Sequence, residues 1–567
     1  MSYPRDMPWK KPGIYNPRMV DTLDYDKVLS YQNQPLLFFD ILQRSFDNYP
    51  DEDYLYFAGS AFTYRQIYDE VMALASGLSS LGVTAEDHVA ILQINAVQFV
   101  VSFFAAQYLG CMVTLLNPIL VDKEYEFLLN DSETTVLLVN DFLYERIFPI
   151  KDNTGLRTIV TAHLGDYVSF LKRKIGVRLG KIPKGTIKDP TTHQWTNVIK
   201  VGRQASVPER VKGTLDDTAV ILYTGGTTGK PKGVELTHRS CLADIQYMFY
   251  WTEPPLDQSF VFVGALPFFH SFGFAVGLLG MTYVGGKIIL IPNPRDVDSI
   301  LKLIDTYKAN FLAAVPTLYI NMLNLLKEKP YDISSLELCL SAAAPLSEAT
   351  QKEFIEVTGS TILEGWGMTE LSPMVTATPV HKPKIGAVGV PVIDIMVKVV
   401  DVETREELPL GEVGELIVTG PTVMKGYYKQ PEETAQVLVD GYMYTGDIGY
   451  MDEDGYIYLV DRLKDMIIVS GYKVFPKDVE EKFMAHPKIE NCAVIGVPDE
   501  KTQERVVIYI KVKKGETMTE EEVREFSNEN LGRYKQPKEI YFREELPLSA
   551  VGKVLRKELR SAYADQK

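Results

Sequence analysis

A segment rich in glycine, threonine and lysine has the composition of an anion-binding loop. Residues 223–233 read Tyr-Thr-Gly-Gly-Thr-Thr-Gly-Lys-Pro-Lys-Gly, and apolar strand patterns precede and follow them at Ala219–Leu222 and Val234–Thr237. Glycine lets successive backbone amides point at phosphate oxygens, while hydroxyl and ammonium groups supply further donors. Lys230 is followed by Pro231, where a Walker phosphate loop needs serine or threonine. The pattern predicts a phosphate-binding loop of another kind, carried between two strands.

Further along the chain, short segments combine histidine, tryptophan, acidic and basic residues in ways that could serve a nucleotide and an acid. Taken alone, each key side chain has an ordinary structural explanation: His270 as a hydrogen-bonded core residue, Trp366 as core, Glu370 as an exposed helix-start carboxylate and Lys553 as a solvated lysine. The functional interpretation depends on the order in which the segments follow one another along the chain. The segments are Leu266–Ser271, Glu364–Glu370, Tyr444–Asp447, Asp461–Arg462, Ser470–Val474 and Pro547–Leu559.

In this order the segments resemble the motifs of the adenylate-forming superfamily, which comprises acyl-CoA synthetases, luciferases and peptide-synthetase adenylation domains. The resemblance covers roughly residues 35–560. It implies two half-reactions at one site. A carboxylate attacks the α-phosphate of ATP and pyrophosphate leaves, and the thiol of coenzyme A then displaces AMP. The implied cofactors are therefore ATP, Mg²⁺ and coenzyme A.

The resemblance also implies which side chains catalyse the reaction. Phosphoryl transfer depends mainly on positioning and on neutralising charge. Lys553 would bridge a carboxylate oxygen and the α-phosphate, and Glu370 would hold Mg²⁺, a hard cation that prefers carboxylate and phosphate oxygens. His270 would line the acyl pocket and orient the carboxylate, and Thr224 would act from the phosphate loop. These four are the expected catalytic residues.

Nucleotide recognition is expected along the same motifs. Asp447 would accept hydrogen bonds from both ribose hydroxyls, Arg462 would add a donor, and the ring of Trp366 would stack on adenine. Gly225 stands where many relatives carry serine, so the loop amides must bind more of the phosphate. The expected ATP contacts are Thr224, Gly225, Gly226, Thr227, Thr228, Gly229, Lys232, Ala343, Ala344, Pro345, Glu364, Gly365, Trp366, Gly367, Met368, Thr369, Asp447, Arg462 and Lys553.

Near the C-terminus, the resemblance implies a mobile domain that presents two different loops. Gly471, Tyr472 and Lys473 are the expected contacts to coenzyme A. Lys464 falls at the family's hinge position, about which the C-terminal domain is expected to turn between the two half-reactions. Lys553 would leave the site when the CoA loop arrives.

The acid expected from the sequence is a medium- or long-chain fatty acid. Relatives that activate acetate carry tryptophan at the position of Gly367, and glycine leaves the pocket floor open. Phe269, His270, Phe274 and Gly367 are the expected pocket residues, and the stretch offers no acidic partner for an amino-acid ammonium group. On this interpretation, Gly367→Trp should remove activity on octanoate and longer acids and spare acetate.

Other functions remain open at this point. An open pocket floor also suits a CoA ligase for a short hydroxy acid or an aryl acid, of the 4-hydroxybutyrate or 4-coumarate kind. A luciferase-like monooxygenase or a non-catalytic binding protein could use the same scaffold. The joint presence of Lys553, Glu370 and Asp447 argues against a protein without catalytic activity.

The elements that must position these residues follow from hydrophobic periodicity. The pattern predicts an amphipathic helix over Tyr64–Leu81 and a strand, helix and strand over 89–94, 96–109 and 111–116. Alternation of strands and helices indicates an α/β fold with parallel strands. Residues 145–213 have scattered glycine and proline and are expected to form an irregular basic excursion.

These patterns predict two domains. A charged run at Asp461–Asp465 separates apolar strands and marks a boundary. We expect a large N-terminal domain of layered α/β subdomains over residues 1–461, which binds ATP and the acyl group. A hinge at 462–465 and a smaller, mobile α+β domain at 466–567 follow, and the latter carries the CoA loop and Lys553.

Charge limits the class of partner. The 567 residues include 59 lysines and arginines and 75 acidic residues, a net charge of −16 that opposes binding to nucleic-acid backbones. Residues 172–188 run against this trend, with seven basic and no acidic residues. The expected partners are a small carboxylic acid, ATP and coenzyme A. Residues 170–188 are either a weak peripheral contact to an anionic membrane or a solvated loop. The oligomeric state stays open, with a homodimer as one alternative.

Cysteine spacing and the uncharged stretches bear on location. The four cysteines show no Cys-x-x-Cys pair and Met1–Met19 lacks the apolar core of a signal peptide, so a cytoplasmic location is expected. Two stretches without charge, 89–121 and 258–286, are long enough to test as membrane spans. Their polar and glycine residues favour a buried strand–helix–strand unit and a backbone packed around a ligand instead.

Overall fold

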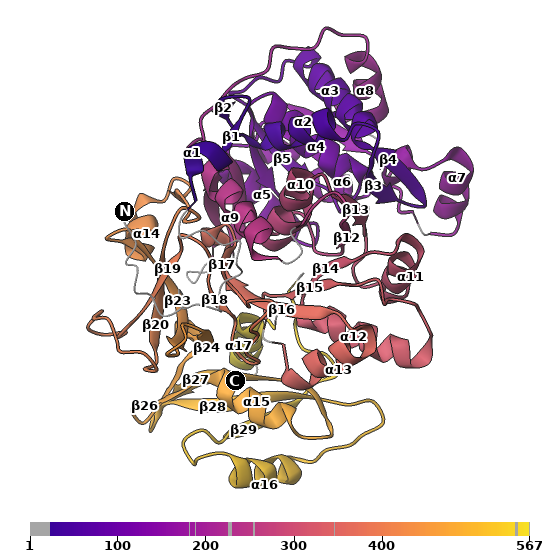
Figure 1. Ribbon diagram of the computed structural model, residues 1–567. Helices are drawn as coiled ribbons and strands as arrows, with labels where there is room; N and C mark the ends of the chain where they lie inside the picture. The colour runs from indigo at the N-terminus through magenta and orange to yellow at the C-terminus, as the bar shows by residue number, and fades with distance from the viewer. Residues whose placement is uncertain are drawn as a thin grey trace. The chain divides into compact units, whose positions relative to one another are not determined.

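The chain folds into two compact units (Figure 1). The computed structural model describes residues 23–180, 182–187, 189–224, 230–252, 256–344, 346–549 and 554–565, without the side chains of residues 26 and 249. Unit 1 contains the chain up to residue 396 and residues 419–441, and unit 2 contains residues 397–418 and the chain from 442 onward.

The first sheet of unit 1 is mostly parallel and carries the expected strand–helix–strand unit. β5 pairs in parallel with β6 and β7, and the intervening helix α4 (Val97–Tyr108) is buried along its whole length. A strand covered on both faces reads as a continuous apolar run, which explains the first uncharged stretch. The sheet order is β21 (Gly426–Tyr427), β11 (Lys232–Thr237), β10 (Thr218–Thr224), β6 (Met112–Leu115), β5 (His88–Leu92), β7 (Val136–Asn140), β8 (Thr158–Ala162), β9 (His193–Gln194).

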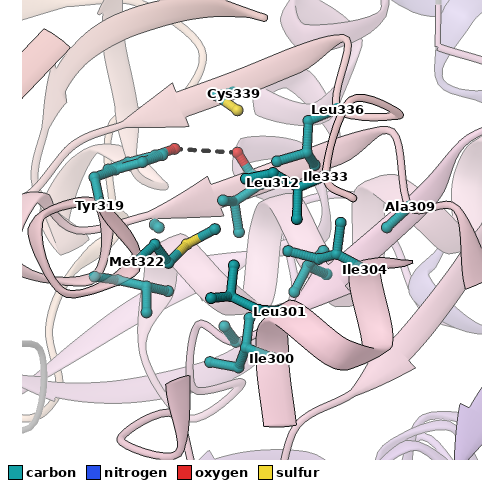
Figure 2. Packing of buried hydrophobic residues seen from close by; sticks show 14 of the residues in the cluster. Ile300, Leu301, Ile304, Ala309, Leu312, Tyr319, Met322, Ile333, Leu336 and Cys339 are labelled. Atoms are coloured by element: carbon teal, nitrogen blue, oxygen red, sulfur yellow. Dashed lines mark hydrogen bonds between the residues drawn. The ribbon is translucent and has the colours of Figure 1, made fainter. Parts of the chain in front are cut away.

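The second sheet of unit 1 has a parallel centre. Its strands run in the order β18 (Val390–Pro391), β17 (Met374–Ala377), β16 (Thr361–Gly367), β15 (Leu338–Ser341), β14 (Phe311–Ala314), β12 (Val261–Gly264), β13 (Lys287–Leu290), β3 (Asp53–Phe57), β4 (Ser60–Thr63). Three helices supply much of its core: α11 (Val297–Tyr307), α12 (Pro316–Glu328) and α13 (Glu348–Thr358). Figure 2 shows Ile300, Leu301 and Ile304 of α11 beside Tyr319 and Met322 of α12.

The remaining helices of unit 1 also follow from local signals. α3 (Tyr64–Ser80) matches the predicted amphipathic helix, and Thr63 caps it by accepting a hydrogen bond from the backbone N–H of Gln66. The others are α1 (Tyr25–Val28), α2 (Phe38–Asn48), α5 (Asp122–Asp131), α6 (Tyr144–Ile147), α9 (His238–Trp251), α10 (Met281–Val284) and α14 (Pro431–Val437).

Residues 145–213 are more regular than their scattered glycines and prolines suggest. They contribute β8 to the first sheet and α8 (Trp195–Gly202), which packs on α3. The contact is so close that a β-carbon on Gly202 would lie 1.7 Å from the carbonyl oxygen of Ala73. The helix α7 (Phe170–Arg178) belongs to the same segment and has no buried residue.

The second uncharged stretch forms β12, a π-helix over Gly273–Gly280 and α10. All eight residues of the π-helix are buried in unit 1. Among the described residues, no helix has both the length and the apolar character that a membrane span requires.

Unit 2 is a smaller α+β body with two sheets. One sheet contains β19 (Met396–Val400), β20 (Gly414–Thr419), β23 (Tyr442–Met451) and β24 (Ile457–Arg462). The other has the order β26 (Tyr472–Val474), β25 (Ile467–Val469), β28 (Gln503–Val512), β27 (Ile489–Asp499), with β29 (Glu539–Phe542) parallel to β28.

Helices cover both faces of this second sheet. Alternate residues of β27 point to opposite faces: Val494 joins the core cluster with residues of α15 (Pro476–Met484) and α16 (Glu520–Asn530). Ile495 joins the cluster with Leu559 and Tyr563 of α17 (Arg556–Asp565).

All four cysteines are buried free thiols. Burial raises the pKa of Cys111 and of Cys339 to about 12, and it also raises the pKa of Cys241 and Cys492. At neutral pH these thiols therefore stay protonated.

Candidate active site

The predicted phosphate loop connects the antiparallel strands β10 and β11. Thr224, the last residue of β10, pairs with Lys232, the first residue of β11. The prediction of strands on both sides of the loop is therefore confirmed. The loop residues Gly225, Gly226, Thr227, Thr228 and Gly229 lie outside the described residues, so their contacts stay a prediction.

Lys232 is held by an ion pair within unit 1. Its side chain is buried, its ammonium group contacts the carboxylate of Glu433 on α14, and it lies 4.9 Å from the centre of the Tyr427 ring. Lys230, two residues earlier, is exposed. To bind a phosphate, Lys232 would have to break its ion pair with Glu433. The side chain of Lys230 is already exposed to solvent.

Glu370, the expected magnesium ligand, belongs to the same group of contacts. Its side chain is 7% exposed, and its Oε1 accepts a hydrogen bond of 3.0 Å from the hydroxyl of Tyr427. Burial, together with the charge of Glu370, raises the pKa of Tyr427, so the hydroxyl keeps its proton and donates. The backbone carbonyl of Glu370 accepts from the N–H of Met424. Glu370 is thus a fixed buried carboxylate and does not occupy an exposed helix start.

The predicted adenine segment begins on β16, continues into the 3-10 turn at Thr369–Leu371 and contacts the histidine segment. Trp366 is buried, and its backbone N–H donates to the hydroxyl of Thr376 on the neighbouring β17. The hydroxyls of Ser271 and Thr369 are 3.2 Å apart. This contact brings the Leu266–Ser271 segment beside the Glu364–Glu370 segment, as one active site requires.

His270 has a defined ring orientation. Its Nδ1 accepts a hydrogen bond from the backbone N–H of Phe272 at 3.3 Å, which places the proton of the neutral ring on Nε2. A protonated Nε2 can donate to a carboxylate oxygen. The half-buried ring therefore has the tautomer that the predicted orienting role needs.

The other expected nucleotide residues of unit 1 lie in a loop after β15. Ala343 adopts a left-handed backbone conformation, with φ of 70°, and is exposed, and Ala344 is half-buried. Such strain in a residue other than glycine is concentrated at functional sites. Pro345 lies outside the described residues.

The predicted ribose clasp is assembled within unit 2. Asp447 on β23 and Arg462 on β24 are paired across the antiparallel strands, and Arg462 Nε lies 2.5 Å from Asp447 Oδ1. Asp447 is 5% exposed, and its backbone N–H donates to the hydroxyl of Thr445. The arginine thus holds the carboxylate in place.

The expected CoA loop is the hairpin between β25 and β26. Val469 pairs with Tyr472, so Ser470 and Gly471 form a two-residue turn, with φ of 51° and 84°. A β-carbon on Gly471 would meet no atom within 4 Å, so the backbone conformation and not packing favours glycine. Tyr472 is exposed and stacks on Tyr534, and Lys473 is exposed.

Lys464 and Lys553 are the two remaining predicted residues in the C-terminal part of the chain. Lys464 is exposed in a short 3-10 helix at Leu463–Asp465, and Lys553 lies outside the described residues. Three residues after Lys553, Arg556 donates to both oxygens of Glu480, at 2.8 and 2.7 Å. Asp465 accepts from Arg560 at 2.8 Å, so α17 is tied to the segment that follows Lys464.

The structure places the predicted acyl-pocket residues in different surroundings. Phe274 is in the core of unit 1, where its ring contacts those of Phe38 and Phe103. Gly367 leaves no room for a side chain, because a β-carbon would lie 1.7 Å from the carbonyl oxygen of Pro373.

A separate apolar cavity of about 20 Å³ lies next to β16, and none of the predicted pocket residues lines it. It is bounded by α9 and by strands β14 to β17. Its lining is Met248, Trp251, Thr252, Phe311, Leu338, Leu340, Leu363, Met374 and Ala377. Leu363 and Met374 flank the adenine segment and the Glu370 turn, so the cavity adjoins the site.

Sequence reasoning missed this cavity and the residues that hold Glu370 and Lys232. The Tyr427–Glu370 contact joins residues 57 positions apart, and the Lys232–Glu433 contact joins residues 201 positions apart. One signal was present: Gly426-Tyr427-Tyr428 precedes a helix start at Pro431 with two acidic residues, Glu432 and Glu433.

Comparison with known proteins assigns the family. Residues 42–428 match the family described as AMP-binding enzyme, and residues 478–553 match the AMP-binding enzyme C-terminal domain. The chain belongs to the AMP-binding enzyme family. The expected resemblance and the α/β fold with a large N-terminal and a smaller C-terminal domain are confirmed.

Relatives of this AMP-binding enzyme cover nearly its whole length. A long-chain-fatty-acid–CoA ligase of Bacillus subtilis is 35% identical over 92% of this chain and 93% of its own. The 4-coumarate–CoA ligase 4 of Arabidopsis thaliana is 30% identical over 89% of this chain and 86% of its own. The solved structure of the anthranilate CoA ligase AuaEII with anthranoyl-AMP has a TM-score of 0.82 and 28% identity, and the match covers 95% of this chain and 99% of that one.

Proposed function

We propose that this AMP-binding enzyme is an acyl-CoA synthetase. It would activate a medium- or long-chain fatty acid with ATP to an acyl-adenylate and pyrophosphate, and then transfer the acyl group to coenzyme A. The observation that carries the proposal is the relationship over 92% of the chain to a protein named long-chain-fatty-acid–CoA ligase. The Glu370, His270 and Asp447 geometry supports it.

The described residues suit the proposed roles. The buried Glu370 carboxylate is a hard oxygen ligand, and carboxylate together with phosphate oxygens is the donor set that Mg²⁺ prefers. Bound Mg²⁺ would neutralise charge on the phosphates. Asp447, fixed by Arg462, would accept hydrogen bonds from the ribose hydroxyls, and His270 Nε2 would donate to the acid. Gly471, Tyr472 and Lys473 are proposed to meet coenzyme A.

The test is AMP release across acids of graded length, with and without coenzyme A. The proposal predicts CoA-dependent AMP release that is strongest on octanoate and longer acids. A preference for 4-coumarate would favour the aryl-acid alternative, which the 30% identity to a 4-coumarate–CoA ligase keeps open. Oxygen-dependent light emission without thioester formation would indicate a luciferase-like reaction.

Tyr427→Phe tests the proposed metal role of Glu370. The variant loses the hydroxyl that donates to Glu370, and a hydrogen bond to a charged group contributes about 1.5–3 kcal/mol. The Mg²⁺ concentration for half-maximal ATP–pyrophosphate exchange is expected to rise roughly tenfold or more, with a smaller change at saturating Mg²⁺. Tyr428→Phe is the control, because that hydroxyl donates to Glu133 instead. An unchanged Mg²⁺ dependence in Tyr427→Phe would contradict the role.

Substitutions of Met248 test whether the apolar cavity receives the acyl chain. At about 20 Å³ the cavity has room for about one water molecule, so an acyl chain can enter only where the cavity opens further. Met248→Ala should enlarge the cavity and shift the preference to longer acids, and Met248→Phe, a small increase in volume, should fill it and shift the preference to shorter ones. Steady-state kcat/KM on octanoate, laurate and palmitate measures both shifts. Met322→Ala is the matched control, because Met322 is equally a core methionine but lies in the α11–α12 cluster. Identical chain profiles in both Met248 variants would rule the cavity out.

Four further features are part of the proposal. The hinge is placed at Lys464 within 462–465, between an N-terminal domain at 1–461 and a C-terminal domain at 466–567. The enzyme is proposed to work in the cytoplasm, where four buried thiols stay reduced, as a monomer or homodimer. Residues 170–188 are proposed as its weak peripheral membrane contact.

A further inference from the structure

The helix α7 and the residue that follows it carry several strongly exposed apolar side chains. The three large apolar side chains with the greatest exposure in the described chain are Phe170, Leu171 and Leu179, at 82%, 68% and 64%. Ile175, 50% exposed, lies between them. Leu171, Ile175 and Leu179, the last of which is the C-cap residue of α7, are spaced four residues apart, so they form one stripe on one side of the helix. A contiguous stripe of this kind marks an interaction surface, unlike scattered exposed residues.

Other side chains of the helix contact neighbouring parts of unit 1 and leave this stripe facing away from them. Arg173 forms an ion pair of 3.3 Å with Asp166. Lys172 Nζ donates to the carbonyl oxygens of Ala58 and Gly59, in the turn between β3 and β4. Figure 1 shows α7 beside β3 and β4 at the margin of unit 1. Gly176 packs on Ile182, where a β-carbon would lie 2.6 Å from Cδ1.

Basic side chains border the exposed stripe. Lys174 and Arg178 are exposed and flank Leu171 and Ile175 on the helix. No acidic residue occurs in residues 172–188, although the whole chain has a net charge of −16. Lys181 and Lys188 lie outside the described residues. The surface is therefore an apolar stripe with a positive border on a negative protein.

We infer that this surface docks on an anionic phospholipid bilayer. The inference deepens the peripheral contact proposed above and does not depend on which acid is activated. A protein partner would need a groove shaped to the stripe, whereas a bilayer accepts an exposed apolar stripe and attracts its basic border. Leu171, Ile175 and Leu179 enter the boundary between headgroups and acyl chains, and Lys174 and Arg178 contact lipid phosphates.

Co-sedimentation with vesicles of phosphatidylcholine, with or without phosphatidylglycerol, tests this inference on the full-length protein. One variant removes the stripe (Leu171→Ser, Ile175→Ser, Leu179→Ser), and another reverses the border (Lys174→Glu, Arg178→Glu). Arg173 and Lys172 are left intact because they hold the helix. The control variant, Lys200→Glu with Val201→Ser, changes an exposed basic and an exposed apolar residue of α8.

The wild type should bind vesicles that contain phosphatidylglycerol more tightly than phosphatidylcholine vesicles. One basic residue near such a surface contributes about fivefold in affinity, so reversing two charges should weaken binding at least roughly 25-fold. The stripe variant should weaken it by a similar factor, and the control should match the wild type. AMP release with soluble octanoate in the absence of vesicles should be unchanged in all variants, which separates this inference from the proposed activity.

Several outcomes would overturn the inference. They are absence of wild-type binding to anionic vesicles, wild-type binding by both the stripe and the border variants, and equal loss in the α8 control. Binding of the wild type to polyglutamate but not to vesicles would indicate an acidic protein partner instead.

Discussion

Lys553→Ala is expected to abolish ATP–pyrophosphate exchange and to spare CoA transfer from supplied acyl-adenylate. In the first half-reaction two anions must approach, and loss of one charge-stabilising donor at such a centre costs about 10²–10³ in rate. In the second half-reaction the resemblance places the CoA loop at the site and Lys553 away from it. The prediction rests on the match of residues 478–553 to the family's C-terminal domain.

Two separate assays measure the two steps: isotope exchange between pyrophosphate and ATP, and thioester formation from synthetic acyl-adenylate. Lys557→Ala is a suitable control, because Lys557 is exposed on α17, four residues after Lys553. Equal loss of both steps in Lys553→Ala would contradict the division of labour between the two loops.

Gly367→Ala is expected to remove adenylation of every acid, short or long. A β-carbon at Gly367 would lie 1.7 Å from the carbonyl oxygen of Pro373 and 2.7 Å from its carbon, both backbone atoms. The backbone before β17 would therefore have to move, and with it the turn that carries Thr369 and Glu370. This expectation differs from the one based on sequence, in which Gly367→Trp removes only the longer acids. Glycine is required at position 367 because the carbonyl group of Pro373 lies too close for any side chain. This requirement holds whatever effect residue 367 has on the depth of the acyl pocket.

Rates of AMP release on acetate, octanoate and palmitate test the two expectations, with thermal unfolding to monitor stability. Gly155→Ala serves as the control in unit 1, since its nearest contact would be an ordinary 3.5 Å. A Gly367→Ala enzyme that kept wild-type rates on acetate would support the pocket-floor interpretation instead.

Local signals predicted most elements of the fold. The helix expected over Tyr64–Leu81 is α3, because capping residues and 3.6-residue periodicity act within a few positions. The segment 145–213 was harder to interpret, because its glycines and prolines obscure short elements. In α8 the buried residues Trp195, Val198, Ile199 and Gly202 have helical spacing, but over only eight residues, and close packing on α3 fixes the place of the helix.

The residues of the candidate site also fall into those that the sequence predicts and those that it does not. Asp447 and Arg462 come together because β23 and β24 are neighbouring strands, and a motif on each can be recognised. Tyr427, Glu433 and Met248 escaped prediction because their contacts join distant parts of the chain. Tertiary contacts of this kind leave no periodic trace in the sequence.

The protonated state of the four cysteines has a practical consequence for studying movement in this enzyme. Thiol-reactive dyes attack the thiolate, and a buried thiol with a pKa near 12 offers almost none. One cysteine introduced at an exposed position in each unit would therefore take up donor and acceptor fluorophores without removal of any native sulfur. Single-molecule energy transfer could then test the proposed turn about Lys464 in an otherwise natural chain.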